Sequence, residues 1–126
     1  MSKKTDEKNN WFKKERTQLL NGATRLILLA IIDRNRETGV HGYTIAEELE
    51  AQTQGEISKS TASYYAVLRR LVDEKLVEIK EGDSIKGPPR KYYFLTVEGR
   101  EVMKALYQNW KYYFNIITAF ENLSGE

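Results

Sequence analysis

Apolar residues along this chain recur at different spacings, and each spacing predicts a different kind of element. Over about 11–36 they recur every three or four positions, which predicts a first helix that Gly22 could kink or split. A second helical pattern covers about 43–53, where Thr44 and Glu47 have the spacing of a capping box.

A third helical pattern begins near Ser58 or Ser60 and runs to about 74. The inward side of this helix is predicted from apolar residues at helical spacing: Tyr64, Val67, Leu68, Leu71 and Val72. Residues 76–81 then alternate between apolar and polar, residues 82–89 contain Gly and Pro, and residues 90–95 are rich in Tyr and Phe. Two strands joined by such a loop predict a β-hairpin.

The last helix is predicted to be capped by Thr96 and to run to about 123. Its apolar positions are spaced by three and four residues for nearly three heptads, which is typical of a helix that packs against another helix. We expect this seam to form a dimer interface, with packing inside one chain as the alternative. The seam consists of Met103, Leu106, Trp110, Tyr113, Ile117 and Phe120.

The predicted order is three helices, a hairpin and a long helix. This order indicates a mainly α fold with a small β-hairpin: a winged helix-turn-helix with a long C-terminal dimerisation helix. We expect a flexible polar arm at 1–10, a winged helix-turn-helix DNA-binding domain at 11–95 and the dimerisation helix at 96–126. In this architecture the third helix enters the major groove of DNA and the hairpin lies beside it.

Composition narrows the function classes. The net charge is only +2, so the distribution of charge matters more than its sum. The absence of cysteine excludes disulfides and thiolate metal sites. The longest apolar run, 26–32, is too short to span a bilayer, and the polar N-terminus lacks the pattern of a signal peptide. We therefore expect a cytoplasmic, nucleoid-associated protein.

Catalysis is not expected. The only histidine is His41, next to Gly42 in a predicted turn, and neither a nucleophile elbow nor a phosphate loop is present. His41 is interpreted as a turn or packing residue. No catalytic residue, metal ligand or cofactor is predicted.

Two groups of residues are candidates for DNA contacts. The outer side of the third helix carries small polar, aromatic and basic residues, which can contact base edges or phosphates: Lys59, Ser60, Thr61, Ser63, Tyr65, Arg69 and Arg70. The predicted loop and the strand after it place Lys86, Arg90 and Lys91 around Gly87-Pro88-Pro89. Each group alone could be a solvated face, but their succession in the chain favours DNA binding.

The sequence resembles the PadR family of transcriptional regulators over about residues 18–123. The motifs that carry the resemblance follow one another in the family's order: Leu26-Ile27-Leu28-Leu29-Ala30-Ile31, Val40-His41-Gly42-Tyr43-Thr44-Ile45-Ala46, Tyr65-Ala66-Val67-Leu68-Arg69-Arg70-Leu71, and the segment 87–99. Thr61-Ala62-Ser63 replaces the family's usual Pro-Gly-Thr-like start of the recognition helix, and Lys75 stands where a Gly is usual.

The resemblance implies a homodimeric repressor of the short class, in which the last helix packs on the partner's first and last helices. Some members of that class bind flat aromatic compounds between paired tryptophans. Trp110 has the matching position and Trp11 could close the same cavity, although Trp110 could equally be part of the dimer core. Two other functions remain open: sequence-neutral DNA coating or partition, and a winged fold that binds only protein.

Overall fold

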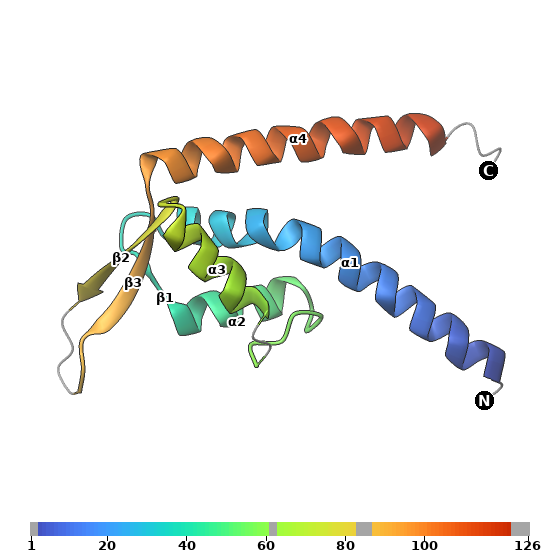
Figure 1. Ribbon diagram of the computed structural model, residues 1–126, viewed down its shortest axis with the longest axis horizontal. Helices are drawn as coiled ribbons and strands as arrows, with labels where there is room; N and C mark the ends of the chain where they lie inside the picture. The colour runs from blue at the N-terminus through green and yellow to red at the C-terminus, as the bar shows by residue number, and fades with distance from the viewer. Residues whose placement is uncertain (1–2, 61–62, 83–86, 122–126) are drawn as a thin grey trace.

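The computed structural model describes residues 3–60, 63–82 and 87–121. Within them it contains four helices and a three-stranded sheet (Figure 1). The elements are α1 (Lys3–Arg34), β1 (Val40–His41), α2 (Gly42–Gln52), α3 (Ser63–Asp73), β2 (Val77–Gly82), β3 (Arg90–Leu95) and α4 (Val97–Glu121). The expected mainly α class, the wing hairpin and the long last helix are confirmed.

The first helix is longer than its apolar pattern indicates. We expected it to begin near Trp11 and end near 36, but α1 runs from Lys3 to Arg34. The polar segment expected to be an arm contains three Lys, one Glu and no Gly or Pro, and Lys and Glu are good helix formers. Gly22 does not split the helix. The helical structure therefore includes most of the segment that we had expected to be separate from it.

The sheet is larger than the predicted hairpin. Its strand order is β1-β3-β2, so β3 is the central strand. The hairpin pairs Ile79 with Tyr93, and β1 adds the pair of Val40 with Tyr93 on the other edge. A two-residue strand is too short to show alternation, and its partner lies about fifty residues further along the chain, so the sequence pattern does not reveal it. Because β3 is held on both edges, the base of the wing is fixed.

The hydrophobic core lies where the second half of α1 meets α2, α3 and the sheet. Its largest fully buried side chains come from all of these elements: Leu28, Leu29, Ile31, Ile32, Ile45, Leu49, Leu68, Leu71 and Val77. A contiguous core of this kind fixes how α3 and the hairpin sit relative to each other.

Helix ends in this fold are formed by backbone bonds and single side chains. The expected capping box of Thr44 and Glu47 is wrong: α2 begins at Gly42 and its N-cap is His41, whose side chain makes no capping bond. The expected cap of α4 is confirmed, because the hydroxyl of Thr96 accepts the N–H of Gly99 at 2.9 Å. Thr44 lies inside the first turn of α2, where it cannot serve as the cap.

The turn after α3 has a special backbone. The N–H of Lys75 donates to the carbonyl of Val72, and the N–H of Leu76 donates to that of Leu71, which is the Schellman pattern of a helix end. Lys75 adopts a φ of 63°, in the left-handed region that favours glycine. This geometry explains why glycine suits the position.

Two helices project from this body. In Figure 1, α1 and α4 both extend away from the hairpin, so that the beginning of α1 and the end of α4 lie on the same side of the molecule. The described side chains of 5–19 and 107–121 are exposed, apart from that of Thr118, which is half-buried. We call residues 28–106 the body and residues 3–19 and 107–121 the projections.

Candidate nucleic-acid interface

Helix α3 has one side in the core and one side in solvent. Leu68 and Leu71 are fully buried, and they hold the helix against the body. The opposite side is exposed and contains four of the predicted contact residues together with Ala66, whose small side chain permits a close approach to DNA: Ser63, Tyr65, Ala66, Arg69 and Arg70. An exposed helix of this kind beside a hairpin is the arrangement that winged proteins use to enter a groove.

A groove of about 190 Å³ separates α3 from the hairpin. Arg69 and Tyr65 of α3 line one side of it, and Lys91 of β3 lines the other. Tyr93 also lines the groove, and burial raises the pKa of its phenol, which therefore stays neutral. The only acidic residue in the described lining is Asp73. The fold thus brings together two predicted cations that are separated by more than twenty residues in the sequence.

The two arginines of α3 lie in different surroundings. Arg69 lines the groove beside the wing. Arg70 acts on Glu74, whose pKa is lowered first by a hydrogen bond from Arg25 and to a smaller degree by the charges of Arg25 and Arg70. Arg25 of α1 holds that carboxylate through two nitrogens, at 2.5 and 3.2 Å. The end of α3 is therefore tied to α1.

The turn before α3 is also held by a carboxylate. Glu50 of α2 accepts the backbone N–H of Lys59 at 2.7 Å, and this bond is the main reason that the pKa of Glu50 is lowered. The hydroxyls of Ser58 and Ser60 lie 2.8 Å apart. Lys59 and Ser60 therefore belong to a turn, and the described part of α3 begins at Ser63, later than the expected start near Ser58 or Ser60.

Lys59 has an aromatic partner that we did not predict. Its ammonium lies 5.5 Å from the centre of the exposed ring of Tyr43, in the first turn of α2. A hydrogen bond to Tyr43, followed by the charge of that side chain, raises the pKa of Lys59, so the lysine is positive at neutral pH. Tyr43 thus lies beside a predicted DNA contact.

The wing cations are only partly described. Arg90 and Lys91 are exposed at the outer end of β3, where Arg90 pairs with Gly82 across the hairpin. The predicted contacts Thr61 and Lys86 lie outside the described residues. His41 is in β1, and its ring centre lies 4.1 Å from that of Tyr92, so this residue packs against the wing strand.

The predicted seam of α4 divides into two parts. Met103 and Leu106 are half-buried and pack against the core of their own chain. The side chains further along α4 are exposed, and the exposed fractions reach 63% at both Ile117 and Phe120. Trp110 and Tyr113 are exposed as well. Only the first part of the seam therefore has a partner inside the chain.

A largely apolar cavity of about 800 Å³ lies between α1 and α4. Leu26, Ile27 and Ala30 line it from α1, and Met103 and Tyr107 line it from α4. Its described lining includes neither of the two tryptophans. Trp110 is one helical turn beyond Tyr107, whereas Trp11 is 58% exposed on the far part of α1.

In the described part of the chain, no three acidic or histidine side chains are grouped so as to hold a metal ion. Nor is any helix among these residues long and apolar enough to cross a membrane.

Comparison with known proteins decides the family. The model of the transcriptional regulator PadR-like family matches residues 28–105, which is more than half of the chain. The chain belongs to the PadR-like family of transcriptional regulators. Its resemblance to that family, inferred above from sequence motifs, is confirmed.

Solved structures of PadR-like proteins have the same fold. A PadR-like transcriptional regulator from Bacillus cereus is 32% identical with a TM-score of 0.66, and the match covers 84% of this chain and 95% of that one. A PadR family regulator from Eggerthella lenta is 21% identical with a TM-score of 0.70, covering 86% and 87%. No curated protein matches the chain in sequence.

The match to the family model covers α3 and the β2–β3 hairpin, the elements predicted to be the recognition helix and the wing. Sequence analysis had selected these two elements, but it missed Tyr43 and Glu50, which position the turn before the recognition helix. Tyr43 lies within the segment His41-Gly42-Tyr43, which is part of the family resemblance. This was the one feature of the sequence that could have indicated its role. The role of Glu50 depends on a contact across nine residues that no local pattern indicates.

Proposed function

We propose that this PadR-like protein is a sequence-specific DNA-binding repressor that acts as a homodimer on chromosomal DNA in the cytoplasm. The observation that carries the proposal is the groove in which Arg69 and Tyr65 of α3 face Lys91 of the wing. When α3 occupies a major groove and the wing an adjacent minor groove, the DNA strand between them passes this point. Cations on both sides of that strand are suited to its phosphates.

The proposed roles differ among the contact residues. Arg69, Arg90 and Lys91 bind phosphates or the minor groove, and they determine affinity and register. Ser60, Ser63 and Tyr65 lie at or near the exposed start of α3, where hydroxyl groups contact base edges. Thr61 and Lys86 are proposed contacts on the basis of sequence alone.

Dimerisation is supported by the projections. The exposed part of the seam on α4 is apolar and aromatic, and a single chain does not cover it. Large exposed apolar surfaces of this kind mark interaction sites. We propose that α4 packs on the α1 and α4 of a second copy, as the family resemblance implies. Repression would follow when the bound dimer occupies a promoter.

We further propose that a flat aromatic ligand releases the DNA. The cavity between α1 and α4 is large enough for a drug-sized molecule, and its lining is mostly apolar. Neither tryptophan lines this cavity in a single chain. We propose that dimerisation brings Trp110 of α4, and Trp11 of α1 as a second stacking residue, to the bound ligand. The probe 8-anilinonaphthalene-1-sulfonate should quench tryptophan fluorescence and weaken DNA binding together. Quenching without any change in DNA affinity would contradict release.

The main test is selection of bound DNA from random sequence, followed by footprinting. A single, roughly palindromic site with two half-sites is expected for a dimeric regulator. Protection that spreads over any DNA would support the coating alternative, and the absence of binding would support a protein-interaction module.

The wing is tested by Arg90→Ala combined with Lys91→Ala. Each phosphate contact contributes about 0.9 to the slope of log affinity against log salt, so the slope should fall by about 2 to 4 for a dimer. Affinity should weaken to a similar degree for all sequences. The control is Lys104→Ala with Lys111→Ala, which removes equal charge from α4. An unchanged slope in the wing variant would overturn the assigned role.

A further inference from the structure

The beginning of α4 is fixed to the turn that ends the recognition helix. The N–H of Thr96 donates to the carbonyl of Leu76 at 3.1 Å, and its hydroxyl donates to the carbonyl of Lys75 at 2.8 Å. Gly99 is buried against the same turn so closely that a β-carbon there would overlap the carbonyl oxygen of Leu76. This contact holds the first turn of α4 at one point.

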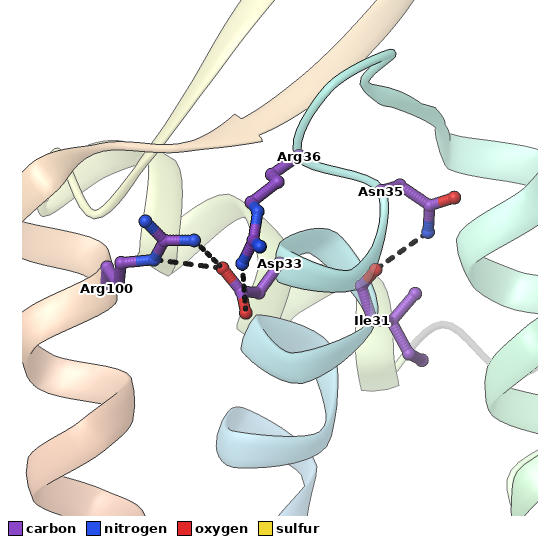
Figure 2. A network of polar contacts seen from close by, with 5 residues as sticks. All are labelled: Ile31, Asp33, Asn35, Arg36 and Arg100. Carbon is purple, nitrogen blue, oxygen red and sulfur yellow. Dashed lines mark hydrogen bonds and ion pairs between the residues drawn. The ribbon is translucent and has the colours of Figure 1, made fainter.

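A second contact holds the same turn of α4 to α1. Nε and Nη2 of Arg100 lie 3.2 and 3.1 Å from Oδ1 of Asp33, in the last turn of α1. The other carboxylate oxygen, Oδ2, lies 3.8 Å from Nη1 of Arg36, in the turn that follows α1. Figure 2 shows Asp33 between the two guanidinium groups. The carboxylate therefore joins α4, α1 and the following turn.

This ion pair is poorly placed to stabilise the fold. The side chain of Asp33 is 20% exposed, but that of Arg100 is 41% exposed and that of Arg36 is 61% exposed, and ion pairs with this much access to solvent contribute little to unfolding stability. A planar guanidinium that binds one carboxylate through two nitrogens is nevertheless directional. The apolar contacts of Met103 and Leu106 are not directional, so they define the angle of the helix less closely than the ion pair does.

A tilt at this junction is amplified along the helix. The 25 residues of α4 span about 37 Å, so a rotation of about 10° at the first turn moves the far end by about 6 Å. From Tyr107 to Ile117 the side chains are exposed, so within one chain the position of this part of α4 depends mainly on the contacts made by residues 96–106.

We propose that Asp33 and Arg100 are positioning residues that set the angle between α4 and the DNA-reading body, and thereby the half-site spacing that the dimer accepts. The proposal rests on the proposed function, because it requires a dimer joined through α4. In such a dimer the distance between the two recognition helices follows from this angle. The distance must match about 34–36 Å, or one turn of DNA, and each added base pair changes it by about 3.4 Å.

The test compares affinities for two DNA duplexes that contain the selected half-sites. One has the selected spacing and the other is one base pair longer. The phosphates at each half-site are the same in both duplexes, so the ratio of the two affinities cancels the general charge term. For Asp33→Asn and for Arg100→Gln we expect the ratio to fall about two- to fivefold, the size that a partly exposed ion pair can supply.

The matched control is Arg34→Gln. It removes a charge one residue from Asp33, but the ion pair of this arginine is with Glu48 of α2, at 3.8 Å, and not with Arg100. Its spacing ratio should equal that of the native protein. Arg100→Lys keeps the charge and should recover part of the native ratio.

The outcomes separate this inference from the proposed function. Unchanged ratios in variants that remain folded and dimeric, as judged by circular dichroism and sedimentation, would overturn the positioning role alone. An Asp33→Asn protein that fails to fold would also overturn it, because the pair would then be needed for stability. A native protein that is monomeric, or that selects no paired half-sites, would instead overturn the proposed function.

Discussion

The body and the projections of this molecule use apolar residues in different ways. In the body, Leu28, Ile45 and Leu71 are completely buried by other parts of the same chain. In the projections, residues of the same kind are exposed, including Phe12 and Leu19 of α1 and much of the end of α4. The body therefore buries a contiguous apolar core within one chain, whereas most of the large apolar side chains of the projections are exposed in a single chain.

The largest expected effect comes from Ile117→Glu combined with Phe120→Glu. Burial of each side chain stabilises an interface by about 1.5–3 kcal/mol. A symmetric dimer contains each of these two side chains twice, so the variant loses the burial of all four. The variant should be monomeric in sedimentation while the body remains folded. Gln108→Glu with Asn115→Glu adds the same charge outside the seam and should leave the dimer intact. If the variant with Ile117→Glu and Phe120→Glu remains dimeric, the exposed residues of the projections do not form the dimer interface.

A moderate effect is expected inside the body, from Lys75→Gly. Lys75 has a φ of 63°, and a residue other than glycine in this region is strained by about 1 kcal/mol. Part of the gain is lost to the greater freedom of glycine in the unfolded chain. The free energy of unfolding should rise by about 0.5 kcal/mol, with no change in the association constant. Urea denaturation of the dimer at several concentrations measures both quantities.

The smallest effect concerns the contact between α1 and the end of α3. The pKa of Glu74 is lowered from its ordinary value of 4.5, mainly by the hydrogen bond from Arg25. The folded state thus favours the charged carboxylate. The contribution of the Glu74 carboxylate to folding stability is fully present above its pKa in the unfolded chain. This contribution is lost as the pH falls through its pKa in the folded protein.

Glu74→Gln should therefore lower stability slightly at neutral pH and flatten the pH dependence below 4.5. Thermal unfolding between neutral pH and acid measures the difference. Glu15→Gln, on the exposed part of α1, is a comparison in the projections. Equal acid sensitivity of the native protein and Glu74→Gln would show that the pair is not linked to folding.

Sequence patterns located the elements whose signals are local. The strand β3 has the predicted bounds, because its aromatic run lies directly between Pro89 and Thr96, which mark the two ends of the strand. The cap formed by Thr96 was predicted because a threonine directly before a helical pattern is itself a local signal. The candidate contacts Arg69 and Lys91 were predicted from type and position, but the groove that brings them together depends on the packing of α3 against the sheet.

Features that depend on distant contacts could not be predicted. The strand β1 exists because Val40 pairs with Tyr93. The serines near 58–60 have the chemistry of helix caps, but Glu50 captures the N–H of Lys59 and keeps this segment in a turn. The start of α1 was missed because its first residues have no apolar periodicity.

The exposed end of α4 has a consequence for the dose response of the regulator. If the active form assembles through this surface, its amount at low expression rises with the square of the chain concentration, by mass action. Below the dimer dissociation constant, promoter occupancy should then rise with the square of the chain concentration, and it should reach one half where the dimer concentration equals the dissociation constant for DNA. The number of apolar side chains on α4 would thereby determine how much protein a cell must make before the regulated gene responds.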